Sequence, residues 1–73
     1  MIFIEAMRID KLNNTKYPTC INIANIEAIE PDSDEPGKTL ITCKNYYAQI
    51  DETYESIKYK IKTAIESQRN QSL

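Results

Sequence analysis

The sequence predicts a small α+β domain, an antiparallel β-meander of about four or five strands with one C-terminal amphipathic helix packed on the sheet. Short segments rich in β-branched and aromatic residues alternate with turn-forming residues over the first two thirds of the chain. An acidic turn with two prolines, PDSDEPGK at residues 31–38, separates two of these segments. Beyond Thr53, apolar residues recur at helical spacing. A length of 73 residues leaves room for one small domain.

The first strand is predicted over residues 2–10, because β-forming residues dominate there and no helix cap precedes them. Apolar residues lie on both of its faces near the start, which indicates either a strand covered on both sides or a strand at a subunit contact. A turn is predicted over residues 13–16 and a returning strand over residues 19–23. Residues 22–25 form either one helical turn or a bend, since Asn22 and Asn25 both favour turns.

The next strands are predicted over residues 26–30 and 39–44, joined by the loop at residues 31–38. Simple alternation places Ile26 and Ala28 on one face of the first of these strands and Ile29 on the other. It likewise separates Leu40 from Ile41 in the second. Residues 45–47 are read as a tight turn with Asn45 near the left-handed conformation, leading into a short strand over residues 47–50.

The helix begins after Thr53, which is a good N-cap, with Asp51 as the alternative cap. Glu52 and Glu55 place negative charge near the positive end of the helix dipole. One apolar stripe follows, formed by Tyr54, Ile57, Ile61, Ala64 and Ile65. We therefore expect a single α+β domain over residues 1–66 and a polar tail over residues 67–73 that frays.

Composition excludes several functional classes. The net charge of −2 and the pI of about 5.0 do not suit a nucleic-acid binder, so no nucleic acid is expected as a partner. The chain has no histidine, the commonest general base, and we expect no catalytic residue and no enzyme. It has one glycine, which excludes a glycine-rich phosphate loop. We expect no cofactor and no metal site.

The two cysteines, Cys20 and Cys43, lie in predicted strands, where a free cysteine usually packs as a small apolar residue. A disulfide or a metal site shared between subunits is the alternative. The N-terminal apolar stretch is too short and too interrupted for a signal peptide, and no segment is long enough to span a bilayer. We therefore expect a cytoplasmic protein with reduced thiols. Abundant Ile, Lys, Asn and Tyr suit a low-GC bacterium or its phage.

The order of these motifs resembles the small bacterial flagellar FlbD-like family over residues 1–65. The resemblance rests on three groups of residues: Asn22 with the run Ile26-Glu27-Ala28-Ile29-Glu30-Pro31-Asp32, then Thr39-Leu40-Ile41-Thr42 with Asn45, then Glu52-Thr53 with Glu55 and Ile57. It implies a non-enzymatic accessory or interaction role, without a cofactor or a catalytic residue. The chain departs from the family pattern in the long loop at residues 31–38 and after Asn45, where Tyr46 replaces the usual glycine.

Two groups of residues are candidates for a partner or ligand surface. Tyrosine offers a large apolar area with one hydroxyl and is favoured at contacts, and lysines beside it suit an acidic partner or a phosphate. The acidic loop suits weak cation binding or a basic partner, although a solvated turn is the simpler interpretation and the calcium-loop spacing is absent. The candidates are Tyr46, Tyr47, Tyr59, Lys58, Lys62, Asp32, Asp34 and Glu35.

We therefore predict a non-enzymatic protein-interaction or regulatory module that resembles FlbD-like proteins. A protein partner is expected, and so is a homo-oligomer, because a domain of this size leaves apolar surface to cover. The alternative is a phage or mobile-element anti-defence protein. Such a protein would inhibit a host protein, or would sequester a nucleotide-like small molecule within an oligomer.

Overall fold

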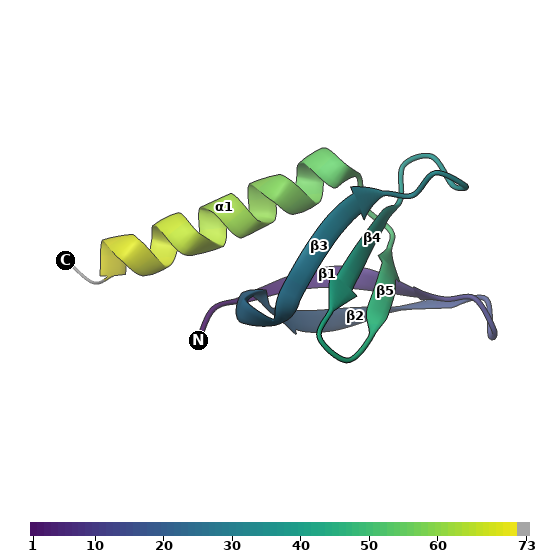
Figure 1. Ribbon diagram of the computed structural model, residues 1–73, viewed down its shortest axis with the longest axis horizontal. Coiled ribbons are helices and arrows are strands. Elements are labelled where there is room, and N and C mark those ends of the chain that lie inside the picture. Colours follow the sequence, from purple (N-terminus) through teal and green to yellow (C-terminus); the bar gives the residue numbers. More distant parts are fainter. Residues whose placement is uncertain (72–73) are drawn as a thin grey trace.

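The computed structural model describes residues 1–71 and shows an antiparallel five-stranded sheet with one C-terminal helix packed on it, which confirms the predicted α+β class (Figure 1). The strands lie in the order β2-β1-β5-β4-β3, so the hairpin of the first two strands joins the meander of the last three where β5 meets β1. The elements are β1 (Phe3–Asp10), β2 (Thr15–Asn22), a short 3₁₀ helix (Ile23–Asn25), β3 (Ile26–Pro31), β4 (Thr39–Cys43), β5 (Tyr47–Ile50) and α1 (Tyr54–Gln71).

The β1–β2 hairpin is longer than predicted. Its strands pair without a break from Phe3↔Asn22 to Asp10↔Thr15. The turn predicted at residues 13–16 is therefore wrong for Thr15 and Lys16, which belong to β2. The carboxylate of Asp10 accepts hydrogen bonds from the backbone of Leu12 and Asn13 at 3.1 and 3.3 Å, which shortens the turn. β2 is an edge strand of the sheet, where a proline such as Pro18 is tolerated.

The short helix and a bulge set the phase of β3. Asn22 caps the 3₁₀ helix, since its side chain accepts a hydrogen bond from Ala24 N. The register of β3 against β4 shifts between Ile26 and Ala28, and both Ile26 and Ile29 pack against the core. The simple alternation predicted for this strand is therefore wrong, because the extra residue of a bulge reverses the faces that follow it.

Strand β4 follows the predicted alternation. Thr39, Ile41 and Cys43 are buried on the helix side of β4, while Leu40 and Thr42 are half-buried on the other side. The predicted left-handed Asn45 is wrong: within residues 1–71, Asn14 is the one non-glycine residue with a positive φ, at 52°. The β4–β5 turn is instead closed by a hydrogen bond from Cys43 N to Tyr46 O at 2.7 Å.

The helix begins as predicted after Thr53, whose hydroxyl accepts a hydrogen bond from Ser56 N at 3.1 Å. Ile57 is fully buried under the helix, and burying such a side chain contributes roughly 1.5–3 kcal/mol. The core consists of Ile4, Ala6, Ile21, Ile41, Cys43, Ala48, Ile50 and Ile57.

The C-terminal half of α1 projects beyond the sheet, on the side where the N-terminus lies (Figure 1). Ile65, part of the predicted apolar stripe, is accordingly 37% exposed. The helix continues through Gln71, so the predicted frayed tail is helical over residues 67–71, and residues 72–73 lie outside the described part. A membrane-spanning length of apolar residues is not found in any helix of residues 1–71.

Candidate functional site

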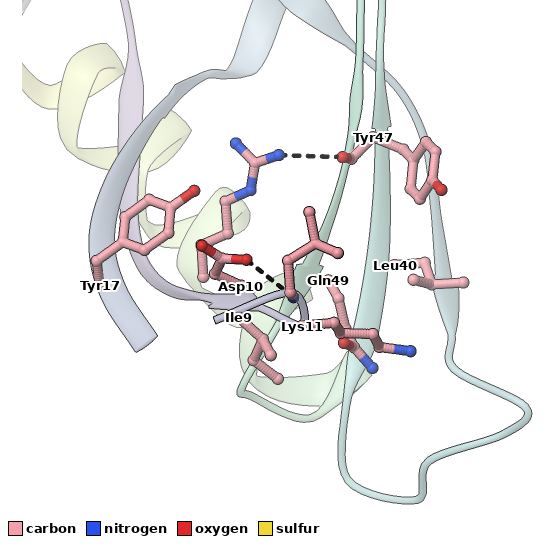
Figure 2. Close-up of a pocket in the computed structure, with 9 residues that line it drawn as sticks. Ile9, Asp10, Lys11, Tyr17, Leu40, Tyr47 and Gln49 are labelled. Carbon is pink, nitrogen blue, oxygen red and sulfur yellow. Dashed lines mark hydrogen bonds between the residues drawn. The ribbon is translucent and has the colours of Figure 1, made fainter. Parts of the chain in front are cut away.

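The structure contains a notch where β1 and β5 separate. The two strands pair at Arg8↔Ile50, and Asp51 N donates to Met7 O at 2.8 Å; no further β1–β5 pair follows toward the hairpin tip. A cavity of about 520 Å³ lies between the diverging strands (Figure 2). Its lining comes from the β1–β2 hairpin and from β4 and β5: Arg8, Ile9, Asp10, Lys11, Leu12, Tyr17, Leu40, Tyr47 and Gln49.

Arg8 bridges the two sides of this notch. Its guanidinium donates to the backbone oxygen of Tyr47 at 3.4 Å and lies over the ring of Tyr46, 5.3 Å from the centroid. No carboxylate lies within ion-pair distance of Arg8 in the described part of the chain. The guanidinium therefore has donors left for an anionic or acceptor group in the notch.

Two tyrosines stand on opposite sides of the notch (Figure 2). Tyr17 faces Arg8 across the β1–β2 hairpin and is 41% exposed, while Tyr47 on β5 is 71% exposed. An exposed aromatic ring on a fixed strand is a stacking surface for planar groups. Tyr47 was predicted as a candidate residue of a partner or ligand surface, and it lies in this notch.

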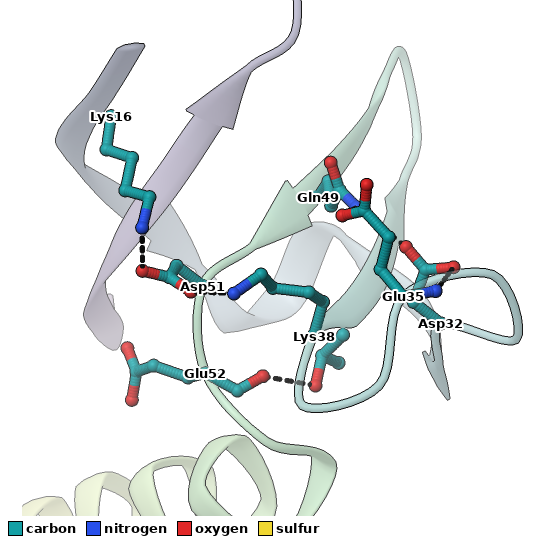
Figure 3. Close-up of polar contacts among 8 residues, drawn as sticks. Lys16, Asp32, Glu35, Lys38, Gln49, Asp51 and Glu52 are labelled. Carbon is teal, nitrogen blue, oxygen red and sulfur yellow. Dashed lines mark hydrogen bonds and ion pairs between the residues drawn. The ribbon is translucent and has the colours of Figure 1, made fainter. Parts of the chain in front are cut away.

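Gln49 is a buried polar residue in the wall of the notch, with 7% of its surface exposed. Its Nε2 donates to Asp32 Oδ2 at 2.7 Å and to Glu35 Oε2 at 2.6 Å (Figure 3). Because both partners are carboxylates, the amide nitrogen must face them and the amide oxygen must face away. The Oε1 atom is buried and has no hydrogen-bond partner.

The acidic loop is organised around Asp32, so the predicted solvated turn is wrong at this residue, while most of the loop is exposed. Asp32 is 9% exposed, and its Oδ1 accepts hydrogen bonds from Asp34 N at 2.9 Å and Glu35 N at 3.3 Å. The hydrogen bond from Asp34 N, with those from Gln49 and Glu35, lowers the pKa of Asp32 against the opposing effect of burial. Asp34 itself remains exposed, so of the predicted acidic group it alone has a solvated side chain.

A chain of ion pairs fixes the end of β5. The carboxylate of Asp51 accepts from Lys16 at 2.8 Å and from Lys38, and these two hydrogen bonds lower its pKa to about 2 (Figure 3). The same contact with Asp51 raises the pKa of Lys38. Glu52 follows, accepting from Thr39 Oγ1 through its backbone oxygen at 2.7 Å. These contacts tie the hairpin, the acidic loop and the helix start together behind the notch.

Tyr46 lies at the edge of the notch and is 43% exposed. A hydrogen bond with the Cys43 thiol, together with partial burial, raises the pKa of Tyr46. Its ring is held against Arg8, so it fixes the position of the guanidinium rather than offering a free stacking face.

The remaining predicted candidates lie on the helix, away from the notch. Lys58 lies over the ring of Tyr54, 5.2 Å from the centroid, and 4.0 Å from Glu55. Lys58 and Lys62 line an apolar groove of about 450 Å³ between the helix and β3. Tyr59, which is 69% exposed, lines a second groove on the β1 side of the helix. The structure therefore divides the predicted surface between the notch, the loop behind it and the helix.

Sequence reasoning missed the residues that make the notch, namely Arg8, Lys11, Tyr17 and Gln49. One signal was present: Gln49 interrupts an apolar strand between Ala48 and Ile50. Gln49 was not singled out, because the position of the loop that covers it could not be predicted from sequence. Arg8 and Tyr17 are joined only by the register of the hairpin.

The cysteines differ from each other. Cys43 is buried as predicted, whereas Cys20 is exposed on the edge strand, so its prediction as a packed residue is wrong. Both are free thiols. Within residues 1–71, no group of three or more His, Cys, Asp or Glu side chains is placed to hold a metal ion.

Comparisons with protein-family models, with curated proteins and with solved structures found no match for this chain. The resemblance to the FlbD-like family therefore stays a prediction. What the geometry defines is an α+β protein with an aromatic and cationic notch at one end of its sheet and apolar grooves beside a projecting helix.

Proposed function

We propose that this chain is a non-enzymatic protein-interaction or regulatory module of the cytoplasm, of the kind that the FlbD-like resemblance implies. The observation that carries the proposal is the projecting half of α1, which leaves part of its apolar stripe without a cover in the chain. Exposed apolar grooves of this kind mark interaction sites. The free thiols of Cys20 and Cys43 support a reducing location.

Apolar groups gather on both flanks of the projecting helix. On the β3 side, Ile29, Ile61 and Ile65 line one groove. On the β1 side, Phe3 at 49% exposure and Tyr59 line the other. Phe3 belongs to the outer face of β1, so the apolar residues on both faces of this strand support a subunit contact.

The occupant that we propose for the β3-side groove is a second copy of this chain. Its helix wall carries the cations Lys58, Lys62 and Arg69 together with the carboxylate of Glu66, while β3 contributes Ile29. A twofold axis brings the same patch of two copies together, so that the helix of each meets the strand of the other. The groove therefore carries both signs of charge on an apolar floor, so the same patch of two copies can be self-complementary.

The test is the molar mass in solution, measured by light scattering after size exclusion. The wild-type chain is expected at a multiple of its 8.4 kDa mass, and Ile65→Glu at 8.4 kDa, because a carboxylate in the groove opposes its burial. Leu12→Glu is the matched control, since Leu12 is 97% exposed at the hairpin tip, far from the helix. A monomeric wild-type protein would contradict self-association, and binding of a different protein at the groove would then be tested by the same variants.

A second candidate function is favoured by the notch. The opposed Tyr17 and Tyr47, with Arg8 between the strands that carry them, suit a small planar ligand rather than a protein surface. A phage or mobile-element protein that sequesters a nucleotide-like molecule would need such a site, and an anti-defence role would follow. Native mass spectrometry of protein purified from cells tests this role, because a sequestered molecule appears as an added mass. A bare protein mass would contradict it.

A further inference from the structure

The buried oxygen of Gln49 is the starting point. Its Oε1 atom has no hydrogen-bond partner, although only 7% of the residue is exposed. The residue lies in the wall of the notch. An acceptor left unpaired in a buried place is costly, and native structures rarely contain one without a reason. The orientation is fixed by Asp32 and Glu35 on the nitrogen side. The notch therefore has a vacant acceptor that a donor group on a ligand would satisfy.

The other lining groups complement this acceptor. Arg8 and Lys11, both in the lining, form no close ion pair among residues 1–71. Asp10, also in the lining, acts on Arg8 at longer range, but its carboxylate is engaged by Leu12 and Asn13. The two lining cations therefore outnumber the one lining carboxylate, which favours an anion such as a phosphate. The ring of Tyr47 offers a free face, since it is 71% exposed. A donor, an anion and a flat ring are thus recognised by three different kinds of side chain: an amide, two cations and an aromatic ring.

We propose that the notch binds a mononucleotide with an amino-bearing base. The base stacks on Tyr47, its exocyclic amino group donates to Gln49 Oε1, and its phosphate faces Arg8. The cavity of about 520 Å³ lies within the range of small-molecule sites. This inference rests on the second candidate function and deepens it by naming the ligand class and the residues that recognise it.

One movement is required for this binding. Gln49 Oε1 has almost no accessible area, so a lining side chain must shift before a ligand reaches it. Lys11 and Leu12 lie at the exposed hairpin tip and have room to move. Leu12 is 97% exposed, so its displacement breaks little packing. The backbone of the notch can stay in place, because β1, β2 and β5 are tied at their paired ends.

The test uses adenosine 5′-monophosphate on the full, isotopically labelled chain, followed by NMR shifts and calorimetry. We expect saturable binding with shift changes at Arg8, Lys11, Tyr47 and the Gln49 side-chain amide. Adenosine lacks the phosphate, and purine riboside 5′-monophosphate lacks the amino group. Each is expected to bind at least about fivefold more weakly, since each loses one polar recognition group. Equal affinity for either analogue would overturn the corresponding contact.

Two variants locate the site. Tyr47→Ala should weaken binding of adenosine 5′-monophosphate by about tenfold, because a stacking ring is lost. Tyr59→Ala is the matched control, since Tyr59 is equally exposed, at 69% against 71%, but lies on the helix. Arg8→Gln should also weaken binding and should abolish the advantage over adenosine. Equal effects of the two tyrosine variants, or shift changes confined to the helix grooves, would overturn the proposal.

Failure of this inference is distinguishable from failure of the function on which it rests. No saturable binding of adenosine 5′-monophosphate would overturn the mononucleotide assignment. If native mass spectrometry still showed an added small mass on protein from cells, sequestration would stand with another ligand class. A bare mass together with no binding would remove both.

Discussion

Asp51 shows how a single carboxylate can join three parts of this fold. It lies just past β5 and accepts hydrogen bonds from Lys16 on β2 and from Lys38 at the end of the acidic loop. Its side chain is 25% exposed, so the two ion pairs are partly shielded from water. Several charges in one geometry contribute more than an isolated surface pair does.

The pKa of Asp51 predicts a pH dependence of stability. It is lowered from the ordinary value of 3.8 to about 2, so the folded state favours the ionised carboxylate. The stabilisation is fully present above the ordinary pKa and is lost as the pH falls through the folded one. Asp51→Asn should therefore lower the urea midpoint at pH 7, and the difference from wild type should shrink below pH 4.

Asp34→Asn is the control for this prediction, because Asp34 is an exposed loop carboxylate whose side chain has no hydrogen bond among those described. Its urea midpoint should follow that of the wild-type protein at both pH values. A constant gap between wild type and Asp51→Asn from pH 7 to pH 2 would show that the loss comes from packing and not from the ion pairs.

At the residue scale, the sequence indicated one of the side chains that line the notch, but not the residues that lie beside it. Tyr47 was predicted as a candidate from its chemistry alone, and it lines the notch. Asp32 was predicted to be solvated, because nothing in the acidic, turn-forming sequence of its loop indicates that the carboxylate points inward to Gln49. Arg8 was missed because its role depends on where β1 leaves β5, which is a tertiary feature.

At the element scale, local signals worked where the element is local. The N-cap Thr53 and the helical spacing after it located the start of α1, and the alternation of β4 predicted its buried face. The phase of β3 was wrong because a bulge is decided by pairing with β4, not by the strand itself. The predicted departure from the FlbD-like pattern after Asn45 falls in the turn that leads to Tyr47 in the notch.

The cap of the helix gives the prediction that belongs to this scale. Thr53→Ala removes the acceptor of the hydrogen bond from Ser56 N and should lower the free energy of unfolding by about 1 kcal/mol. Thr53→Ser retains the hydroxyl, and because serine is at least as good an N-cap as threonine, this variant should keep the stability of the cap. Chemical denaturation followed by circular dichroism measures both. Equal losses for the two variants would show that the threonine methyl group, and not the cap, supports the helix.

At the scale of the whole molecule, the class of fold followed from the order of segments, but the shape did not. An α-helix of 18 residues is about 27 Å long, which exceeds what this small sheet can cover. The molecule is accordingly elongated, at 44 × 21 × 19 Å. The adjacency of β5 to β1 joins segments far apart in the chain, and no local pattern encodes it. The notch results from that adjacency, whereas the helix projects because of its length.

The elongated shape leads to a prediction about stability and concentration. If the projecting helix is covered by a second copy, unfolding is coupled to dissociation, and the thermal midpoint must rise with protein concentration. For a dimer, each tenfold rise in protein concentration adds about 1.4 kcal per mole of dimer to the free energy of unfolding. Differential scanning calorimetry over a hundredfold range, on the order of what the instrument allows, measures this shift.

Ile65→Glu distinguishes a thermal midpoint set by association of two copies from one set by the packing of a single chain. Ile65 is 37% exposed and lies beyond the sheet, whereas Ile57 is fully buried beneath the same helix. The Ile65 variant should therefore keep its fold and show a midpoint that no longer depends on concentration. Ile57→Ala should instead lower the midpoint at every concentration, since it leaves a cavity of the kind that costs about 2–5 kcal/mol. A wild-type thermal midpoint that is independent of concentration would mean that the chain folds with its helix uncovered. A second copy would then be excluded as the occupant of the groove, and a different protein would be the remaining candidate.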